Sequence, residues 1–423
     1  MNVEVVTIGD ELLLGFTIDT NGAHLARELA AAGITIVRRT SVGDDAGAIA
    51  AAVGEALDRT GGVITTGGLG PTSDDLTKPS IAALFGRAMR RDDAIVDNLK
   101  VLWTSRGWPG PLPASNLQQA MVPDGATILT NRHGSAPGIW LEDERGRWVA
   151  MLPGVPREMR GMLADELLPR LRARVTGAPL VIASRTLRVT GLGESAVADK
   201  LGLLARAPEG LSLAYLPGVE GVDLRLTSRG RLLAESDIVL ERGIAALRDV
   251  LGSLVYGEGT TDLADVVLGE CRARGFRIAV AESCTGGLLG ARLTAIPGSS
   301  GVVLGGVIAY ADAVKESQLG VRAWTLATHG AVSEETAREM ASGVRERFGA
   351  DVGVSITGIA GPGGGTPEKP VGSVCLAVDV RGAVRSARTT TVGDRAEIRQ
   401  RSAQAALDLV RKALHETPAR SNA

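Results

Sequence analysis

Short apolar runs alternate with amphipathic helical stretches along residues 1–170, and this alternation constrains the fold more than any other feature of the sequence. Each run has the length of a buried strand, and each following stretch spaces its apolar residues as a helix does. The successive runs and stretches are 3–8 and 21–32, 34–38 and 45–59, and 63–66 and 76–85. This order predicts an α/β fold with a doubly wound, mostly parallel sheet. Ligands of such sheets bind at the carboxyl ends of the strands, so we expect a site there.

Two changes of pattern divide the rest of the chain. Residues 171–257 combine short alternating strands with two helices, which predicts a small α+β domain. Residues 258–415 return to alternating strands and helices and predict a second α/β domain. Its expected strands are 276–281, 302–310, 352–357 and 372–380, and its expected helices are 263–274, 333–348 and 394–414. We therefore predict three domains, spanning 1–170, 171–257 and 258–415.

The composition is that of an ordinary globular protein and argues against several classes of partner. Of the 423 residues, 44% are hydrophobic and 22% are charged, and the formal net charge is -2. No apolar run approaches the roughly 20 residues of a membrane span, and residues 1–9 lack the features of a signal peptide. Aromatic residues make up only 3%, and no basic stripe accompanies the glycine-rich turn at 191–194, which argues against nucleic acid. We expect a cytoplasmic protein with neither a membrane nor a nucleic-acid partner.

A glycine-rich turn with two carboxylates follows the predicted strand at 63–66. Its chemically informative residues are Gly67, Gly68, Thr72, Asp74 and Asp75. Successive backbone N–H groups before a helix favour phosphate, whereas adjacent carboxylates repel it unless a divalent cation lies between them. The spacing matches neither a Walker loop nor a dinucleotide fingerprint. The turn therefore predicts a metal-assisted phosphate site.

Two further acidic pairs follow the first and second predicted strands. Asp10 and Glu11 follow the first strand, and Asp44 and Asp45 follow the second. An Asp directly before a helix commonly caps its first N–H groups. We favour the cap for Asp45 and a functional role for Asp10 and Glu11.

The first strand predicted in the third domain ends in a turn that carries three nucleophiles. Ser283, Cys284 and Thr285 stand there directly before a helix. A nucleophile at a strand-to-helix turn suits acyl transfer, because the helix-start amides can receive an oxyanion. Either His329 or Lys315 could supply the base, although His329 also fits a structural turn and Lys315 a surface position. The residues alone predict an acyl-transfer site and leave its nucleophile and base open.

Five motifs lie in order across most of residues 1–165. They are 9–13 (GDELL), 19–21 (DTN), 66–75 (TGGLGPTSDD), 134–138 (GSAPG) and 152–159 (LPGVPREM). Together they resemble the N-terminal, molybdopterin-binding-like domain of the CinA family. The resemblance implies hydrolysis of ADP-ribose to AMP and ribose 5-phosphate, activated by a divalent metal (Mg, Mn or Co) and by potassium. It implies that Gly67, Gly68 and Thr72 hold the diphosphate. The carboxylates implied to bind metal are Asp10, Asp44 and Asp74, and Asp74 or Asp75 would position the attacking water.

Five further motifs lie in the third domain. They are 281–287 (AESCTGG), 297–300 (PGSS), 329–333 (HGAVS), 357–362 (TGIAGP) and 369–372 (KPVG). They resemble the CinA C-terminal domain, an amidohydrolase that converts nicotinamide mononucleotide (NMN) and water to nicotinate mononucleotide and ammonia without a cofactor. The resemblance implies Ser283 as nucleophile, Lys315 as base and Tyr310 as proton relay or orienting group. The residues implied to line the site or to hold the substrate phosphate are Thr285, Gly286, Thr357, Gly358, Arg395 and Arg399.

The expected architecture is thus α/β, with a molybdopterin-binding-like doubly wound domain, a KH-like α+β connector and an α/β deamidase domain. The expected function is a bifunctional hydrolase of pyridine-nucleotide salvage that acts on NMN and ADP-ribose, and the family implies a homodimer. Two alternatives remain open. The first domain could process molybdopterin or another nucleotide, or the protein could be a non-catalytic partner in competence or the DNA damage response.

Overall fold

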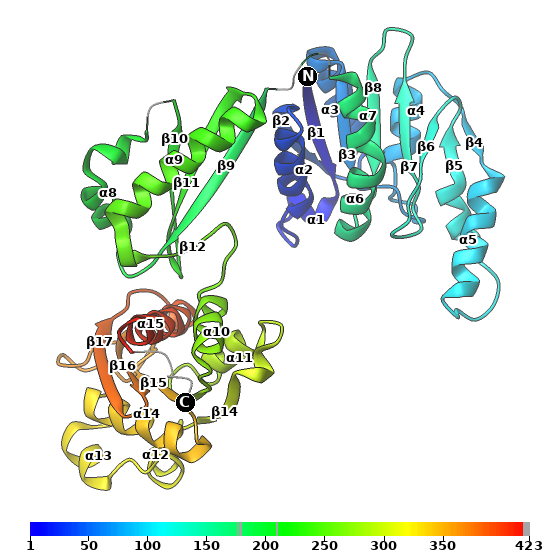
Figure 1. Cartoon of the computed structure of the whole chain (residues 1–423). Coiled ribbons are helices and arrows are strands. Elements are labelled where there is room, and N and C mark those ends of the chain that lie inside the picture. Colours follow the sequence, from blue (N-terminus) through cyan, green and yellow to red (C-terminus); the bar gives the residue numbers. More distant parts are fainter. Residues whose placement is uncertain (176, 178–179, 209, 418–423) are drawn as a thin grey trace. The chain divides into compact units, whose positions relative to one another are not determined.

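The structure is a computed structural model that describes residues 1–175, 177, 180–208 and 210–417. The chain forms two compact units, Met1–Ala183 with Ser228–Ile238, and Ser184–Thr227 with Val239–Ala423 (Figure 1). Each unit has hydrophobic cores of its own. Within the described ranges, no helix is both long and apolar enough to cross a membrane.

A six-stranded sheet forms the centre of the first unit. Its strands are β1 (Asn2–Ile8), β2 (Thr35–Val42), β3 (Gly62–Thr66), β6 (Thr127–Leu129), β7 (Gly138–Glu142) and β8 (Trp148–Leu152). They lie in the order β2-β1-β3-β8-β7-β6. The strands β2, β1, β3 and β8 are parallel to one another, β7 is antiparallel to β8, and β6 is antiparallel to β7. A separate antiparallel pair joins β4 (Met89–Arg91) to β5 (Met121–Pro123). The prediction of a doubly wound, mostly parallel sheet is confirmed.

Helices cover both faces of this sheet (Figure 1). They are α1 (Asp10–Leu13), α2 (Thr20–Ala31), α3 (Ala46–Thr60), α4 (Thr77–Leu84), α5 (Asp93–Ser105), η1 (Ala114–Ala120), α6 (Pro156–Met162), η2 (Leu163–Leu167) and α7 (Leu168–Arg174). Side chains alternate across a strand, so Val3 and Val5 of β1 are buried with α2 and α6. Val6 and Ile8 are buried on the other face with α3 and α4. Because both faces are covered, a ligand reaches this sheet at the strand ends.

The connector is a four-stranded sheet with helices. Its elements are β9 (Val181–Val189), α8 (Glu194–Leu201), η3 (Gly202–Arg206), β10 (Ser212–Gly218), β11 (Gly221–Arg231), α9 (Leu233–Leu251), η4 (Gly252–Leu254) and β12 (Val255–Glu258). The strand order is β10-β11-β9-β12. The α+β prediction is confirmed. The sequence did not predict β12, which pairs antiparallel with the carboxyl-terminal part of β9.

A five-stranded sheet forms the last part of the chain. Its strands are β13 (Ile278–Glu282), β14 (Val303–Ile308), β15 (Val352–Gly358), β16 (Ser373–Val380) and β17 (Ala383–Thr390), in the order β14-β13-β15-β16-β17. The strands β14, β13 and β15 are parallel to one another, β16 is antiparallel to β15, and β17 is antiparallel to β16. The helices are α10 (Leu263–Arg274), α11 (Leu288–Thr294), η5 (Ser299–Gly301), α12 (Asp312–Leu319), α13 (Ala323–His329), α14 (Glu334–Phe348) and α15 (Arg395–Glu416). Ile278 and Val280 face α10 and α15, whereas Ala279 and Ala281 face α14, so the second α/β domain is also confirmed.

The connector and helix α15 contact one another inside the second unit. The Arg411 side chain is only 5% exposed and pairs with Asp408 at 2.6 Å. Its Nη2 donates to the carbonyl oxygen of Ser253 at 2.6 Å, and Gln404 Nε2 donates to Thr190 Oγ1 at 3.3 Å. The Asp408 carboxylate lies 3.8 Å from where a Cβ on Gly191 would be. The Lys412 ammonium lies 3.9 Å from the same point and pairs with Asp408 at 2.7 Å, so the glycine-rich turn faces an ion pair.

Candidate active sites

A cavity of about 510 Å³ opens in the first unit at the carboxyl ends of β1, β3 and β8. Two glycines of the turn after β3 have left-handed backbone, with φ of 109° at Gly67 and 65° at Gly68. A Cβ on Gly67 would stand 2.1 Å from the carbonyl oxygen of Ile8, and one on Gly68 would stand 2.1 Å from Thr77 Oγ1. Larger residues do not fit at either position. The turn therefore brings its backbone against the neighbouring strand, as the sequence predicted for an anion-binding loop.

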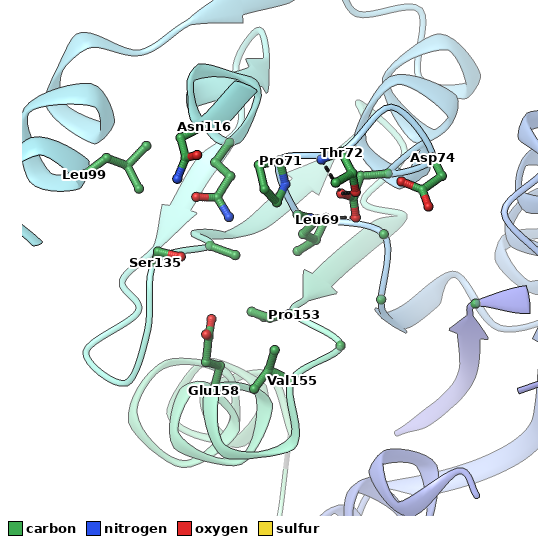
Figure 2. Close-up of a pocket in the computed structure, with 18 of the residues that line it drawn as sticks. Leu69, Pro71, Thr72, Asp74, Leu99, Asn116, Ser135, Pro153, Val155 and Glu158 are labelled. Carbon is green, nitrogen blue, oxygen red and sulfur yellow. Dashed lines mark hydrogen bonds between the residues drawn. The ribbon is translucent and has the colours of Figure 1, made fainter. Parts of the chain in front are cut away.

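Asp75 holds this loop together. Its carboxylate accepts hydrogen bonds from Gly70 N at 2.7 Å, Thr72 N at 2.8 Å and Thr72 Oγ1 at 2.5 Å. Asp74 is exposed and lines the cavity on one side of the loop (Figure 2). The two neighbouring carboxylates thus have different surroundings, since Asp75 shapes the loop and Asp74 lies exposed at the cavity wall.

The acidic pairs after β1 and β2 meet each other. Asp10 N donates to Asp44 Oδ2 at 3.0 Å, and Asp44 N donates to Asp10 Oδ1 at 3.2 Å. Partial burial raises the pKa of Asp44, and the negative charges of Asp10, Glu11 and Asp74 raise it further. The predicted metal-binding carboxylates are therefore close enough to repel one another. Asp45 caps α3 by accepting from Ala48 N at 2.8 Å, as expected.

Protein side chains alone do not form a complete metal site here. In the part of the chain that the structure describes, no group of three or more His, Cys, Asp or Glu side chains is arranged to hold a metal ion. Magnesium is commonly held by one or two carboxylates together with waters and substrate phosphates. The hard oxygen donors and the raised pKa of Asp44 fit such a shared site.

Two buried residues hydrogen-bond to segments that line the first cavity. Lys78 of α4 is 1% exposed, and its Nζ donates to the backbone oxygens of Gln118 at 2.7 Å and Gln119 at 3.2 Å. Burial lowers its pKa to about 8. Asn21 Nδ2 donates to Thr66 Oγ1 at 3.1 Å and to the oxygen of Gly154 at 2.7 Å, which fixes the end of β3. The DTN motif contained a signal for Asn21, but no pattern indicated that Lys78 is buried.

The second candidate site lies at the carboxyl ends of β14, β13 and β15. Ala309 N donates to the oxygen of Glu282 at 2.7 Å, and Ser283 N donates to the oxygen of Ile356 at 2.9 Å. These bonds continue the parallel ladders past the strand ends. The sheet therefore places Ser283, Tyr310 and Thr357 at one edge on three adjacent strands.

A buried glutamate fixes the turn that carries Ser283. The Glu282 side chain accepts hydrogen bonds from Gly287 N at 3.1 Å, Leu289 N at 3.0 Å and Gly290 N at 2.8 Å. These amides belong to the start of α11, where a negative charge is favourable. The Glu282 carboxylate thus ties the end of β13 to the start of the next helix.

The three candidate nucleophiles have different environments. Ser283 is 8% exposed, and Cys284 is 6% exposed. Burial raises the pKa of the Cys284 thiol to about 11, so the thiol is protonated and weakly nucleophilic at neutral pH. Thr285 is completely buried, and its Oγ1 has no hydrogen-bond partner. These environments favour Ser283.

Lys315 is buried and does not lie on the surface, which corrects the alternative that the sequence left open. Its side chain is 1% exposed and pairs with Asp312 Oδ1 at 3.0 Å. Lys315 Nζ also donates to the backbone oxygen of Tyr310 at 3.4 Å. The other candidate base, His329, packs its ring against Trp324 and has Nδ1 at 3.8 Å from Glu335. Lys315 is therefore the candidate base that contacts the strand-end cluster, through the backbone of Tyr310.

Two arginines of α15 reach the same edge. Arg395 Nη2 donates to the Tyr310 hydroxyl at 3.1 Å, and Nη1 donates to the oxygen of Gly361 at 2.6 Å. Arg399 Nη2 donates to the oxygen of Thr285 at 2.6 Å and lies 3.6 Å from where a Cβ on Gly286 would be. Thr357, which directly precedes Gly358, donates from its Oγ1 to the backbone oxygen of Ala331 at 2.7 Å. The structure thus joins the predicted substrate-binding residues to the turns around Ser283 and Tyr310.

The fold and the two strand-end sites define an α/β protein and are consistent with a nucleotide-processing role. Its segments match three family models, described as probable molybdopterin binding domain (residues 4–173), damage-inducible protein CinA KH domain (184–257) and CinA C-terminal domain (260–414). The chain belongs to the CinA family.

Full-length relatives agree with this assignment. A CinA-like protein of Gemmatimonas aurantiaca is 63% identical, over 98% of this chain and 96% of the relative. One from Kosmotoga olearia is 42% identical, over 98% of this chain and 99% of the relative. Among solved structures, the competence/damage inducible protein CihA from Agrobacterium tumefaciens is 44% identical and covers 36% of this chain and 93% of its own, with a TM-score of 0.35.

Proposed function

We propose that the protein is a bifunctional hydrolase of pyridine-nucleotide salvage. The second unit would convert NMN and water to nicotinate mononucleotide and ammonia. The observation that carries this proposal is the cluster of Ser283, Tyr310 and Thr357 at three adjacent strand ends, with the buried Lys315 against the backbone of Tyr310. NMN and ADP-ribose are the proposed ligands, and a homodimer is the expected assembly.

In the proposed deamidation, Ser283 Oγ attacks the carboxamide carbon of NMN and Lys315 Nζ accepts the serine proton. The Asp312 carboxylate stabilises the ammonium that Lys315 then carries, because the two groups pair at 3.0 Å. The proton moves on to the amide nitrogen, the carbon–nitrogen bond breaks and ammonia leaves. Water hydrolyses the remaining ester, and Arg395 and Arg399 would hold the substrate phosphate throughout.

Product formation tests this activity directly. Purified protein is incubated with NMN, and ammonia and nicotinate mononucleotide are measured. Ser283→Ala and Lys315→Met are expected to lose the activity. Cys284→Ala is the matched control, because it changes the neighbouring buried side chain and should retain turnover. Full turnover in Ser283→Ala would refute the proposed nucleophile.

For the first unit we propose hydrolysis of ADP-ribose, supported by a cavity that combines the glycine turn with the carboxylates of Asp44 and Asp74, and Asp10 lies next to Asp44. Backbone amides around Gly67 and Gly68 would hold the diphosphate, and Asp74 would orient the attacking water. Water attacks one phosphorus and the bridging phosphorus–oxygen bond breaks, giving AMP and ribose 5-phosphate. A divalent metal held by one or two of the carboxylates Asp10, Asp44 and Asp74, together with waters and the substrate diphosphate, would neutralise charge on the leaving phosphate.

AMP release from ADP-ribose tests the second activity. Asp44→Asn is expected to lower the rate of AMP release strongly, because Asp44 contributes to the local negative charge that the metal neutralises. Asp45→Asn is the matched control. Asn also caps a helix, and the Asp45 carboxylate is expected to be dispensable for AMP release. Lack of product from both NMN and ADP-ribose would favour a binding partner without catalysis.

A further inference from the structure

The cavity of the first unit has two chemically different ends. One end is formed by the glycine turn and Asp74, which suit a metal-bound diphosphate. The other end is apolar and carries Leu99, Leu102, Trp103, Trp108 and Leu112. Figure 2 shows Leu99 on the side of the pocket away from Asp74, with Pro71 between them. A diphosphate accounts for the first end only, so the apolar end needs another part of the ligand.

Two of the five tryptophans of the chain lie at this apolar end. The rings of Trp103 and Trp108 have centroids 4.6 Å apart and an interplanar angle of 69°. Trp103 is fixed by its Nε1, which donates to the oxygen of Gly110 at 3.1 Å. Trp108 is 45% exposed although it is large and apolar. A flat aromatic ligand would cover it, since aromatic rings bind nucleobases by stacking.

Two amide side chains accompany the tryptophans. Asn116 and Gln119 come from η1 and line the same cavity. Gln119 is 4% exposed, and its Oε1 has no hydrogen-bond partner among the residues that the structure describes. Lys78 holds the backbone oxygen of Gln119 at 3.2 Å, so the segment is anchored. A buried acceptor without a partner calls for an N–H donor from the ligand.

We propose that the apolar end is a base subsite that stacks an adenine ring on Trp108 and Trp103 and accepts its exocyclic N–H at Gln119 Oε1. Amide side chains pair with the N6 and N7 edge of adenine. Hypoxanthine presents an oxygen at the same position and leaves Gln119 unsatisfied. The cavity volume of about 510 Å³ is that of a site for a whole nucleotide. The inference rests on the proposed function, because the diphosphate end sets where the base must lie.

Binding of AMP and IMP to the full chain tests the subsite, measured by calorimetry without turnover. Trp108→Ala is expected to weaken AMP binding at least about tenfold, because stacking on an aromatic side chain contributes about that much per base. Trp108→Phe should restore most of it. Gln119→Met, close in size, should bring the AMP and IMP affinities together. Trp324→Ala, an exposed tryptophan of the other unit, is the control and should change nothing.

The outcomes separate this inference from the proposed function. Unchanged AMP affinity in Trp108→Ala, or an unchanged AMP preference in Gln119→Met with the protein folded, overturns the base subsite. If these variants also hydrolyse ADP-ribose with the wild-type KM, the proposed function stands without the subsite. If AMP binds as expected but ADP-ribose is not hydrolysed, the subsite stands and the proposed hydrolysis fails.

Discussion

Replacing Glu282 by Gln should destabilise the second unit and displace the turn that carries Ser283. Glu282 is 1% exposed, and its two oxygens accept three backbone N–H groups. Gln retains only one of the two carboxylate oxygens, and its side-chain NH2 would face a backbone N–H group that is itself a donor. A lost charge-assisted bond and an unsatisfied buried donor together cost about 3 kcal/mol. For a unit of this size the unfolding midpoint should fall by about 6–12 °C.

Calorimetry of the full chain gives the measurement, because the transition of the second unit is the one that NMN raises. Glu241→Gln, an exposed position of α9, is the control and should leave the midpoint within about 1 °C. The kcat for NMN should fall at least tenfold in Glu282→Gln, since the nucleophile loses its position. A midpoint equal to that of the control, with unchanged kcat, would refute the idea that the Glu282 carboxylate organises this turn.

Other predictions concern charge, metal and phosphate. Burial lowers the pKa of Lys78 to about 8 from its ordinary 10.5. Between these pH values the unfolded chain binds the proton and the folded chain does not, so the free energy of unfolding should rise with pH by up to about 3 kcal/mol. Denaturant titrations at several pH values should show this rise, and Lys78→Met should abolish it. A chelator should stop AMP release from ADP-ribose and leave ammonia release from NMN unchanged; equal loss of both would contradict two independent sites. Arg399→Ala should raise the KM for NMN about tenfold or more with a smaller change in kcat, and an unchanged KM would exclude it as a phosphate ligand. Asp75→Asn should lower the midpoint of the first unit, whereas Asp74→Asn should change AMP release alone; the reverse pattern would show that the two roles are exchanged.

The parallel strands β1 and β3 were predictable because nearly all of their residues are buried, whereas the equally buried parallel strand β8 was not predicted. Runs such as 3–8 (VEVVTI) and 276–281 (FRIAVA) are mostly apolar, which is typical of buried strands. The strand β12 was missed because Val255–Glu258 is short, contains Gly and pairs through its backbone. The edge strand β17 was missed because most of Ala383–Thr390 is polar and exposed on one side. Edge strands depend on partners that lie elsewhere in the chain.

The sites were predictable to the extent that backbone geometry dictates residue type. Gly67 and Gly68 stand out in the sequence, and the structure explains them by positive φ and close contacts. The burial of the two lysines could not be predicted from the sequence. For Lys78 it depends on a segment 40 residues away, and for Lys315 it depends on the packing of α12 against α14. Nor could the sequence distinguish Asp75, which braces its loop, from Asp74 beside it.

Helix α15 has a consequence for how the protein is made. It is the last helix of the described chain, and it supplies Arg395 and Arg399 to one site and Arg411 to the connector. During synthesis the first unit has all of its strands and can fold early, because domains generally fold as they emerge. The second unit has to wait for residues near its very end. A chain shortened before Arg411 should therefore leave the ribosome with a finished first half and an unfinished second half, exposing apolar sheet to proteases and aggregation.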